Sequence, residues 1–264
     1  MSLAGKRIVV TRALEQSAPL VALLEAAGAE ALVLPCIEIV DPEDFAPADE
    51  AIGALPDYDW VVFTSVNAVE RFVRRLEHQG HAASVLASVR VAAVGPATAA
   101  ALETYGITPE FVPDEHVGEG VLEGLLTRGV GAGSRVLMPR ALEAREVLAP
   151  GLAAVGATCD VVPVYRTVLA DGDPAVLARI RAGEADAVVF TSPSTVKGFM
   201  RLLGDQAPDG KEPQAIAMPE GFAVAVIGPV TARAARSANL RVEVEPSEYT
   251  TTALVAALGE YFEG

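Results

Sequence analysis

The sequence contains few of the features that mark secreted, disulfide-bonded or membrane proteins. It has 2 cysteines, and aromatic residues make up 5% of its 264 positions. No apolar run reaches the roughly 18 residues that a transmembrane helix needs, and the first residues lack the apolar core of a signal peptide. We therefore expect a cytoplasmic protein in which Cys36 and Cys159 are buried free thiols and form no disulfide.

Basic residues are also scarce relative to acidic ones. The chain has 20 Lys and Arg against 35 Asp and Glu, a net charge of −15. Nucleic acids and anionic membranes both require clustered basic residues, so we expect neither as a partner. An anionic small molecule stays compatible, because backbone amides at helix N-termini and a few arginines can bind it locally. The three histidines, His78, His81 and His116, lack metal-ligand spacing with Cys, Asp or Glu, and we predict no metal site.

What the sequence does contain is an internal duplication. Three blocks recur in the same order: residues 7–15 with 135–143, 59–65 with 186–192, and 91–99 with 224–232. Within each block the offset is constant, and the small changes between blocks fit loop insertions. Taken alone, the repeat places a division of the chain near residue 130.

Each half alternates short β-rich apolar runs with helical patterns. Strands are expected near residues 7–11, 31–34, 60–64, 90–94 and 109–112, and again near 135–138, 160–164, 187–191, 223–227 and 241–244. Continuous runs such as Trp60–Phe63 are typical of strands buried on both faces. Apolar residues from Val66 to Leu76 recur at helical spacing, and Gly80 ends that helix. The pattern predicts an α/β protein with two similar parallel-sheet domains.

Candidate ligand-binding residues lie where a predicted strand ends and a helix begins, because open α/β sheets bind ligands at that edge. Hydroxyl and amide side chains here can cap the helix and leave backbone N–H groups for a carboxylate. Glycine permits close approach, and proline suits the first helical turn. Ordinary capping is the alternative. The residues are Thr64, Ser65 and Asn67 with Thr191, Ser192 and Ser194, and Gly95 and Thr98 with Gly228 and Thr231.

Four basic residues accompany these positions. Arg12 and Arg140 are expected just after equivalent strands, with Arg145 nearby. An arginine fork pairs well with a carboxylate, although a surface arginine that compensates acidic neighbours is equally ordinary. Lys197 lies one turn into a predicted helix, where it could contact a carboxylate or only solvent.

Tyr165 interrupts the repeat. Its counterpart in the first half is Ile37, so the duplication alone does not account for a phenol there. A phenol at a segment that crosses between domains could donate a proton to a leaving group. Packing at a domain hinge is the alternative.

The ordered motif set resembles the uroporphyrinogen-III synthase family. The resemblance rests on the duplicated Val-Phe-Thr-Ser and Gly-Pro-x-Thr blocks, on residues 138–141 and 144–146, and on Val164-Tyr-Arg-Thr167, and it runs from about Arg7 to about Leu258. It implies two α/β domains joined by a two-stranded connector, with a substrate cleft between them. By this resemblance one domain comprises residues 1–36 plus 168–264, and the other comprises residues 37–167.

The same resemblance implies a reaction. Hydroxymethylbilane, a linear tetrapyrrole with eight carboxylates, is cyclised to uroporphyrinogen III with loss of water and inversion of ring D, as a step of tetrapyrrole biosynthesis. No cofactor takes part. Tyr165 is the catalytic candidate, and the helix-start and basic residues above are candidates for binding substrate. A monomer is expected, and transient contact with the preceding enzyme of the pathway is left open.

Three other functions stay open at this point. A non-catalytic two-domain small-molecule binding protein would share the architecture, but such proteins are usually exported. A two-domain glycosyltransferase would need a nucleotide site, which the motifs do not provide. A protein that kept the fold and lost activity cannot be distinguished by sequence.

Overall fold

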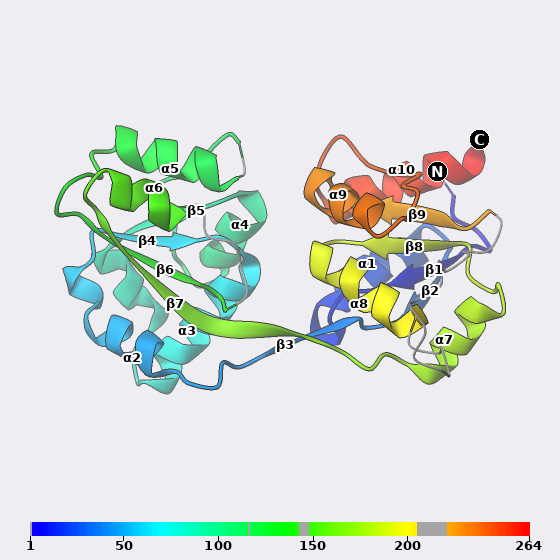
Figure 1. The fold of residues 1–264 in the computed structure, drawn as a ribbon, viewed down its shortest axis with the longest axis horizontal. Helices are drawn as coiled ribbons and strands as arrows, with labels where there is room; N and C mark the ends of the chain where they lie inside the picture. Colours follow the sequence, from blue (N-terminus) through cyan, green and yellow to red (C-terminus); the bar gives the residue numbers. More distant parts are fainter. Residues whose placement is uncertain (1, 116, 143–147, 205–220) are drawn as a thin grey trace. The chain divides into compact units, whose positions relative to one another are not determined.

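The structure, a computed structural model, describes residues 2–115, 117–142, 148–204 and 221–264 (Figure 1). The chain folds into two compact units, residues 1–39 with 168–264 and residues 40–167. It passes from one unit to the other through strands β3 (Ile37–Val40) and β7 (Thr158–Leu169), which are neighbours in one sheet. Both units are α/β with parallel strand pairs, as the sequence predicts.

The unit of residues 1–39 and 168–264 is built on a four-stranded sheet of order β2-β1-β8-β9. Its strands are β1 (Arg7–Val10), β2 (Glu30–Val33), β8 (Ala187–Phe190) and β9 (Ala223–Val226). Its helices are α1 (Leu14–Ala26), α7 (Pro174–Arg181), α8 (Pro193–Gly204), α9 (Pro229–Ser237) and α10 (Thr251–Glu263).

Successive residues of these strands point into two different apolar cores. Val9 and Val188 pack with the residues of α7, α8 and α9 on one face. Ile8 and Val189 pack with those of α1 and α10 on the other face. Because both faces are covered, the buried positions of these strands are apolar, which explains the continuous runs in the sequence.

The unit of residues 40–167 is built on a five-stranded sheet of order β3-β7-β6-β4-β5. Besides β3 and β7, its strands are β4 (Trp60–Phe63), β5 (Arg90–Ala93) and β6 (Arg135–Ala141). Its helices are α2 (Ala46–Gly53), α3 (Val66–His78), α4 (Pro96–Thr104), α5 (Gly118–Thr127) and α6 (Leu148–Ala154), with short 3-10 turns η1 (Leu55–Asp57) and η2 (Ala83–Ser88). Helices α5 and α6 cover one face, and α3 and α4 cover the other (Figure 1).

The duplication is visible in the packing of the two units. Phe63 at the end of β4 meets Phe72 of α3 edge to face, with ring centroids 5.8 Å apart. At the equivalent place Phe190 meets Phe199 of α8, with centroids 5.3 Å apart. The same strand–helix pair therefore recurs in both units.

The repeated aspartates at the amino edge of each sheet are structural. The Asp59 carboxylate accepts a hydrogen bond from the backbone N–H of Arg135 at 2.8 Å. Asp186 accepts one from the backbone N–H of Arg7, also at 2.8 Å, and the Arg7 guanidinium adds an ion pair at 3.2 Å. Each aspartate thus ties the start of one central strand to the next, at the edge opposite the predicted ligand positions.

Two strand predictions are wrong. Around residues 109–112 and 241–244 the chain makes only single parallel bridges, Phe111 with Ala92 and Val244 with Ala225. Neighbouring prolines lack the N–H that a longer ladder requires. The thiol prediction also changes in part, because Cys36 is buried whereas Cys159 is half-buried; the two form no disulfide.

Gly198 of α8 is expected to tolerate no side chain. A Cβ atom there would lie 2.3 Å from the backbone carbonyl oxygen of Cys36, which accepts a hydrogen bond from Ala170. Gly198→Ala should therefore lower the free energy of unfolding by about 1–3 kcal/mol, the usual cost of overpacking. Gly53, the last residue of α2, has nothing within 4 Å. Gly53→Ala should raise stability by up to about 1 kcal/mol. Denaturant unfolding of both variants measures the two changes in the free energy of unfolding. Equal changes would contradict the prediction that a side chain is excluded at residue 198 and tolerated at residue 53.

Candidate active site

In the unit of residues 40–167, the chain leaves the two central strands in opposite directions. Strand β4 leads through α3 to β5 on one side, and β6 leads through α6 to β7 on the other. Ligands of open α/β sheets bind where such connections diverge. Thr64 and Ser65 follow β4 at this point. Arg140 differs from its prediction, because it lies inside β6 instead of after it and is only 5% exposed.

Ser65 and Tyr165 meet at this edge. Ser65 caps α3, since its Oγ accepts a hydrogen bond from the backbone N–H of Ala68 at 3.1 Å. The same Oγ lies 3.2 Å from the hydroxyl oxygen of Tyr165, which is 7% exposed. One hydroxyl donates to the other, and either can be the donor. The capping prediction for Ser65 is therefore confirmed, and the cap also holds the phenol of a residue 100 positions away.

A register shift between β6 and β7 lies beside this contact. Arg140 pairs with Pro163, but the next residue, Ala141, pairs with Tyr165. One extra residue on β7 changes which side chains reach the edge of the sheet, as bulges near functional sites commonly do. The Tyr165 carbonyl accepts a hydrogen bond from the N–H of Leu142 at 3.0 Å, which fixes the backbone there.

A second helix starts at the same edge, after β5. Gly95 precedes α4 in an extended conformation, and Pro96 opens the helix. Thr98 lies in the first turn and is 4% exposed, yet its hydroxyl has no hydrogen-bond partner among the residues that the structure describes. The first N–H groups of a helix also lack helical partners. Asn67 is half-buried in the first turn of α3.

In the unit of residues 1–39 and 168–264, the connections diverge between β1 and β8. Thr11 joins these strands, because its hydroxyl donates to the Val189 carbonyl at 2.7 Å. Arg12 follows directly and is half-buried. Burial lowers the pKa of its guanidinium from the ordinary value. Within the described part of the chain, no hydrogen-bond or ion-pair partner accompanies this desolvated charge.

The helix that follows β8 begins with a reciprocal cap. The Ser192 Oγ accepts from the N–H of Thr195 at 3.3 Å, and the Thr195 hydroxyl donates to the Ser192 carbonyl at 2.7 Å. Thr191 and Ser194 are half-buried beside this cap, whereas Lys197 is exposed on α8. Ser192 therefore caps α8, as the capping alternative predicts.

After β9 the pattern of β5 recurs. Gly228 precedes α9 in an extended conformation, and Pro229 opens the helix. Thr231 in the first turn is 3% exposed, and within the described residues its hydroxyl has no partner, as for Thr98. Two buried threonines with unused hydroxyls at equivalent helix starts are consistent with a ligand at each. Arg145 lies outside the described residues.

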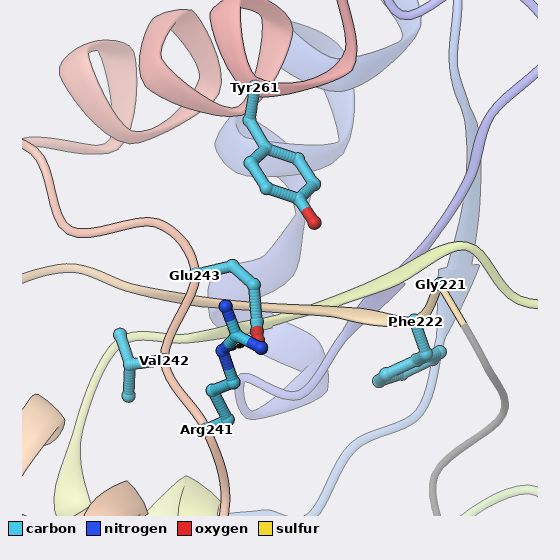
Figure 2. A pocket seen from close by; sticks show the side chains of 6 residues that line it. All are labelled: Gly221, Phe222, Arg241, Val242, Glu243 and Tyr261. Carbon is cyan, nitrogen blue, oxygen red and sulfur yellow. Dashed lines mark ion pairs between the residues drawn. The ribbon is translucent and has the colours of Figure 1, made fainter. Parts of the chain in front are cut away.

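A surface pocket lies at the opposite, amino edge of the same sheet (Figure 2). Gly221 and Phe222 directly precede β9, and Tyr261 of α10 faces Arg241 and Glu243 across the pocket. Its charged groups have partners within the protein. The Glu243 carboxylate accepts a hydrogen bond from the Val224 N–H at 2.8 Å and forms an ion pair with Arg241 at 3.3 Å. None of the predicted site residues lines this pocket.

Two other kinds of feature are absent from the described residues. No group of three or more His, Cys, Asp or Glu residues in residues 2–115, 117–142, 148–204 and 221–264 could hold a metal ion. Over the same residues, no helix has the length and apolar character needed to cross a bilayer.

Comparison with known families then decides where the chain belongs. The family model described as uroporphyrinogen-III synthase HemD matches residues 18–256. The chain belongs to the uroporphyrinogen-III synthase family. It is 36% identical to the uroporphyrinogen-III synthase of Synechococcus elongatus, over 98% of this chain and 96% of that protein. It is 34% identical to a putative uroporphyrinogen-III synthase of Methanothermobacter thermautotrophicus, over 95% and 96% of the two chains.

Solved structures of uroporphyrinogen III synthases share the fold. A crystal structure from Thermus thermophilus aligns with a TM-score of 0.64 at 19% identity, over 98% of this chain and 99% of that one. A structure from Helicobacter pylori aligns with a TM-score of 0.58 at 17% identity, over 95% and 97%. The two-domain α/β architecture that the sequence predicts is therefore confirmed as that of the uroporphyrinogen-III synthase family.

Three residues at these helix starts were not found from the sequence. Thr11 and Thr195 complete the hydrogen bonds that hold the edge, and Tyr249 lies against Gly228. The signal for Thr195 was present, because a Ser followed three residues later by a hydrogen-bonding residue is the pattern of a reciprocal cap. No local pattern marks Thr11, whose partner is 178 positions away.

Proposed function

We infer that this chain is a lyase that cyclises hydroxymethylbilane in tetrapyrrole biosynthesis. Its family and its similarity to uroporphyrinogen-III synthases over nearly the whole chain support this activity. The structural observation that carries the proposal is the contact of the buried Tyr165 hydroxyl with Ser65 at the carboxyl edge of a sheet. It supplies a proton donor beside helix starts that suit carboxylates.

The substrate's carboxylates are proposed to bind at the helix starts. Each start offers backbone N–H groups without helical partners and the positive end of the helix dipole. This explains how a protein of net charge −15 can bind a polyanion without a basic surface. The proposed binding residues are Thr64, Ser65, Asn67, Gly95, Thr98 and Arg140 in one unit, and Arg12, Thr191, Ser192, Ser194, Lys197, Gly228 and Thr231 in the other, with Arg145 outside the described residues.

The proposed first step is loss of the substrate's terminal hydroxyl. The Tyr165 hydroxyl donates its proton to that oxygen while the adjacent pyrrole nitrogen supplies an electron pair, and the C–O bond breaks to release water. The resulting azafulvene-type cation is attacked by the substituted carbon of the last pyrrole, which gives a spiro intermediate. Fragmentation and reclosure invert ring D, and loss of a proton restores the aromatic pyrrole.

The protein's main contribution after that step is proposed to be orientation. The substrate supplies all of the reacting carbons, so the reaction requires no cofactor or metal. Without the enzyme the same cation closes without inversion, and the chain must therefore hold the substrate in the conformation that favours the spiro route. A monomer in the cytoplasm, in transient contact with the preceding enzyme, completes the proposal.

Supplying hydroxymethylbilane and separating the product isomers tests the activity. We expect the type III isomer to form in proportion to the amount of protein, while a protein-free control gives type I. Type I alone at the uncatalysed rate would refute the enzyme assignment. If the substrate bound without being turned over, the non-catalytic binding protein would be the correct alternative.

A further inference from the structure

Tyr249 is an exposed aromatic residue whose ring lies beside a helix start. It lies between the Val244 bridge and α10, and its side chain is 60% exposed. Its ring lies against Gly228, where a Cβ atom would come within 2.9 Å of Cδ1 and 3.1 Å of Cγ. Gly228 has φ 173°, an extended conformation open to any residue. A side chain at position 228 would therefore meet the Tyr249 ring, whereas the backbone conformation there does not itself call for glycine.

The ring stands next to a helix start with unused polar groups. Gly228 precedes α9, a helix of nine residues. Thr231 in its first turn is 97% buried, since it is 3% exposed, and has no hydrogen-bond partner among the described residues. Val230, between them, is 54% exposed although it is apolar. A flat ring and an exposed apolar side chain thus accompany the start of the helix that also carries the Thr231 hydroxyl and the first N–H groups.

We propose that Tyr249 positions the substrate by packing against one of its pyrrole rings. The open face of the phenol offers a flat apolar surface, on which another aromatic ring can stack. A carboxylate on a short side chain of that pyrrole can then reach the Thr231 hydroxyl and the first N–H groups of α9. This role rests on the proposed function, and it makes Tyr249 a residue that selects how the tetrapyrrole lies.

A purely structural role for Tyr249 makes a different prediction. The residue directly precedes Thr250, which caps α10 by accepting from the Ala253 N–H at 3.1 Å. An apolar residue before a helix cap often stabilises the helix by packing on its first turn. That role would be kept by leucine and would affect stability, whereas stacking requires a flat ring and affects substrate binding.

The experiment compares three replacements by steady-state formation of the type III isomer. Tyr249→Phe keeps the ring and should leave KM within about twofold of the original value. Tyr249→Leu and Tyr249→Ala should raise KM about five- to tenfold with kcat within about twofold, the range expected for loss of an aromatic pair. Tyr261→Leu is the matched control, because Tyr261 is an exposed tyrosine of the same unit at the opposite edge, and it should change neither parameter.

The outcomes separate this inference from the proposed function. Formation of type III by the original protein establishes the activity independently of any variant. Equal KM values for the Leu variant and the original protein would overturn the role of Tyr249, as would a Phe variant as impaired as Ala. Melting temperatures identify variants that do not fold, and the Leu variant, which keeps an apolar residue before the cap, decides the matter if Ala unfolds.

Discussion

Tyr165→Phe is expected to lower kcat about 100-fold or more while KM changes less than about threefold. The phenyl ring keeps the packing of a side chain that is 7% exposed, but the hydroxyl that contacts Ser65 at 3.2 Å is lost. If this hydroxyl protonates the leaving oxygen, only the transition state loses an interaction, and the effect appears in kcat. Steady-state rates of type III formation measure both parameters.

Tyr58→Phe is the matched control for that variant. Tyr58 is also a buried tyrosine of the same unit, and its hydroxyl donates to Asp160 at 2.7 Å. It precedes β4 and therefore lies at the amino edge of the sheet, away from the proposed site. Burial, and then the bond to Asp160, raise the pKa of Tyr58 to about 12. The fold thus favours the neutral phenol, a contribution present below about pH 10 and lost as the pH rises through 12.

Tyr58→Phe should accordingly lower stability at neutral pH and leave kcat unchanged. If Tyr58→Phe loses stability but keeps its turnover, and Tyr165→Phe keeps its stability but loses turnover, the two hydroxyls have different roles. The Tyr58 hydroxyl would then be structural and the Tyr165 hydroxyl catalytic. Unchanged turnover in Tyr165→Phe would remove that residue from the mechanism. A large rise in KM with kcat intact would instead assign its hydroxyl to substrate binding.

The sequence pattern predicted the strands and helices better than it predicted which strands share a sheet. Apolar runs such as Trp60–Phe63 are strands because both faces of each sheet are covered. The repeat, however, does not coincide with the structural unit. Strands β1 and β2 come from the first copy, whereas β8 and β9, which complete their sheet, come from the second. The spacing of apolar residues shows which face of a strand or helix is buried. It does not show which of the two repeat copies supplies the elements that pack against that face.

The parts of the site that were predictable are those with a local cause. A helix after a buried strand creates capping positions, so Ser65 and Ser192 followed from spacing alone. The contact of Ser65 with Tyr165 did not, because it depends on the register shift between β6 and β7. Arg140 was misplaced for a related reason, since β6 continues beyond the length of its counterpart β1.

Tyr249 was missed although a signal existed. The offset of the third repeated block continues past it, aligning Pro113 with Pro246 and Glu115 with Glu248. Tyr249 then aligns with His116, which lies outside the described residues. Both copies thus carry a flat ring after the same short motif, and this repeated pattern marks the position in the sequence.

Arg12→Met is expected to raise KM about 10- to 100-fold and, without ligand, to raise the melting temperature. The Arg12 guanidinium is half-buried, burial lowers its pKa, and no partner accompanies it within the described residues. At neutral pH the protonated group therefore costs folding free energy, which methionine of similar size relieves. If a substrate carboxylate normally pairs with it, loss of that charged hydrogen bond removes about 1.5–3 kcal/mol of binding.

Arg7→Met is the matched control, since Arg7 lies at the other end of the same strand and pairs with Asp186 at 3.2 Å. It removes the same charge, but it also removes a partner from Asp186, so the melting temperature should stay equal or fall while KM stays unchanged. Thermal unfolding and steady-state kinetics of both variants give the comparison. A higher melting temperature and a raised KM in Arg12→Met alone would show that the Arg12 charge binds substrate and destabilises the fold. Equal rises in KM would contradict this, because they would reflect only weaker attraction of an anionic substrate by a more acidic protein.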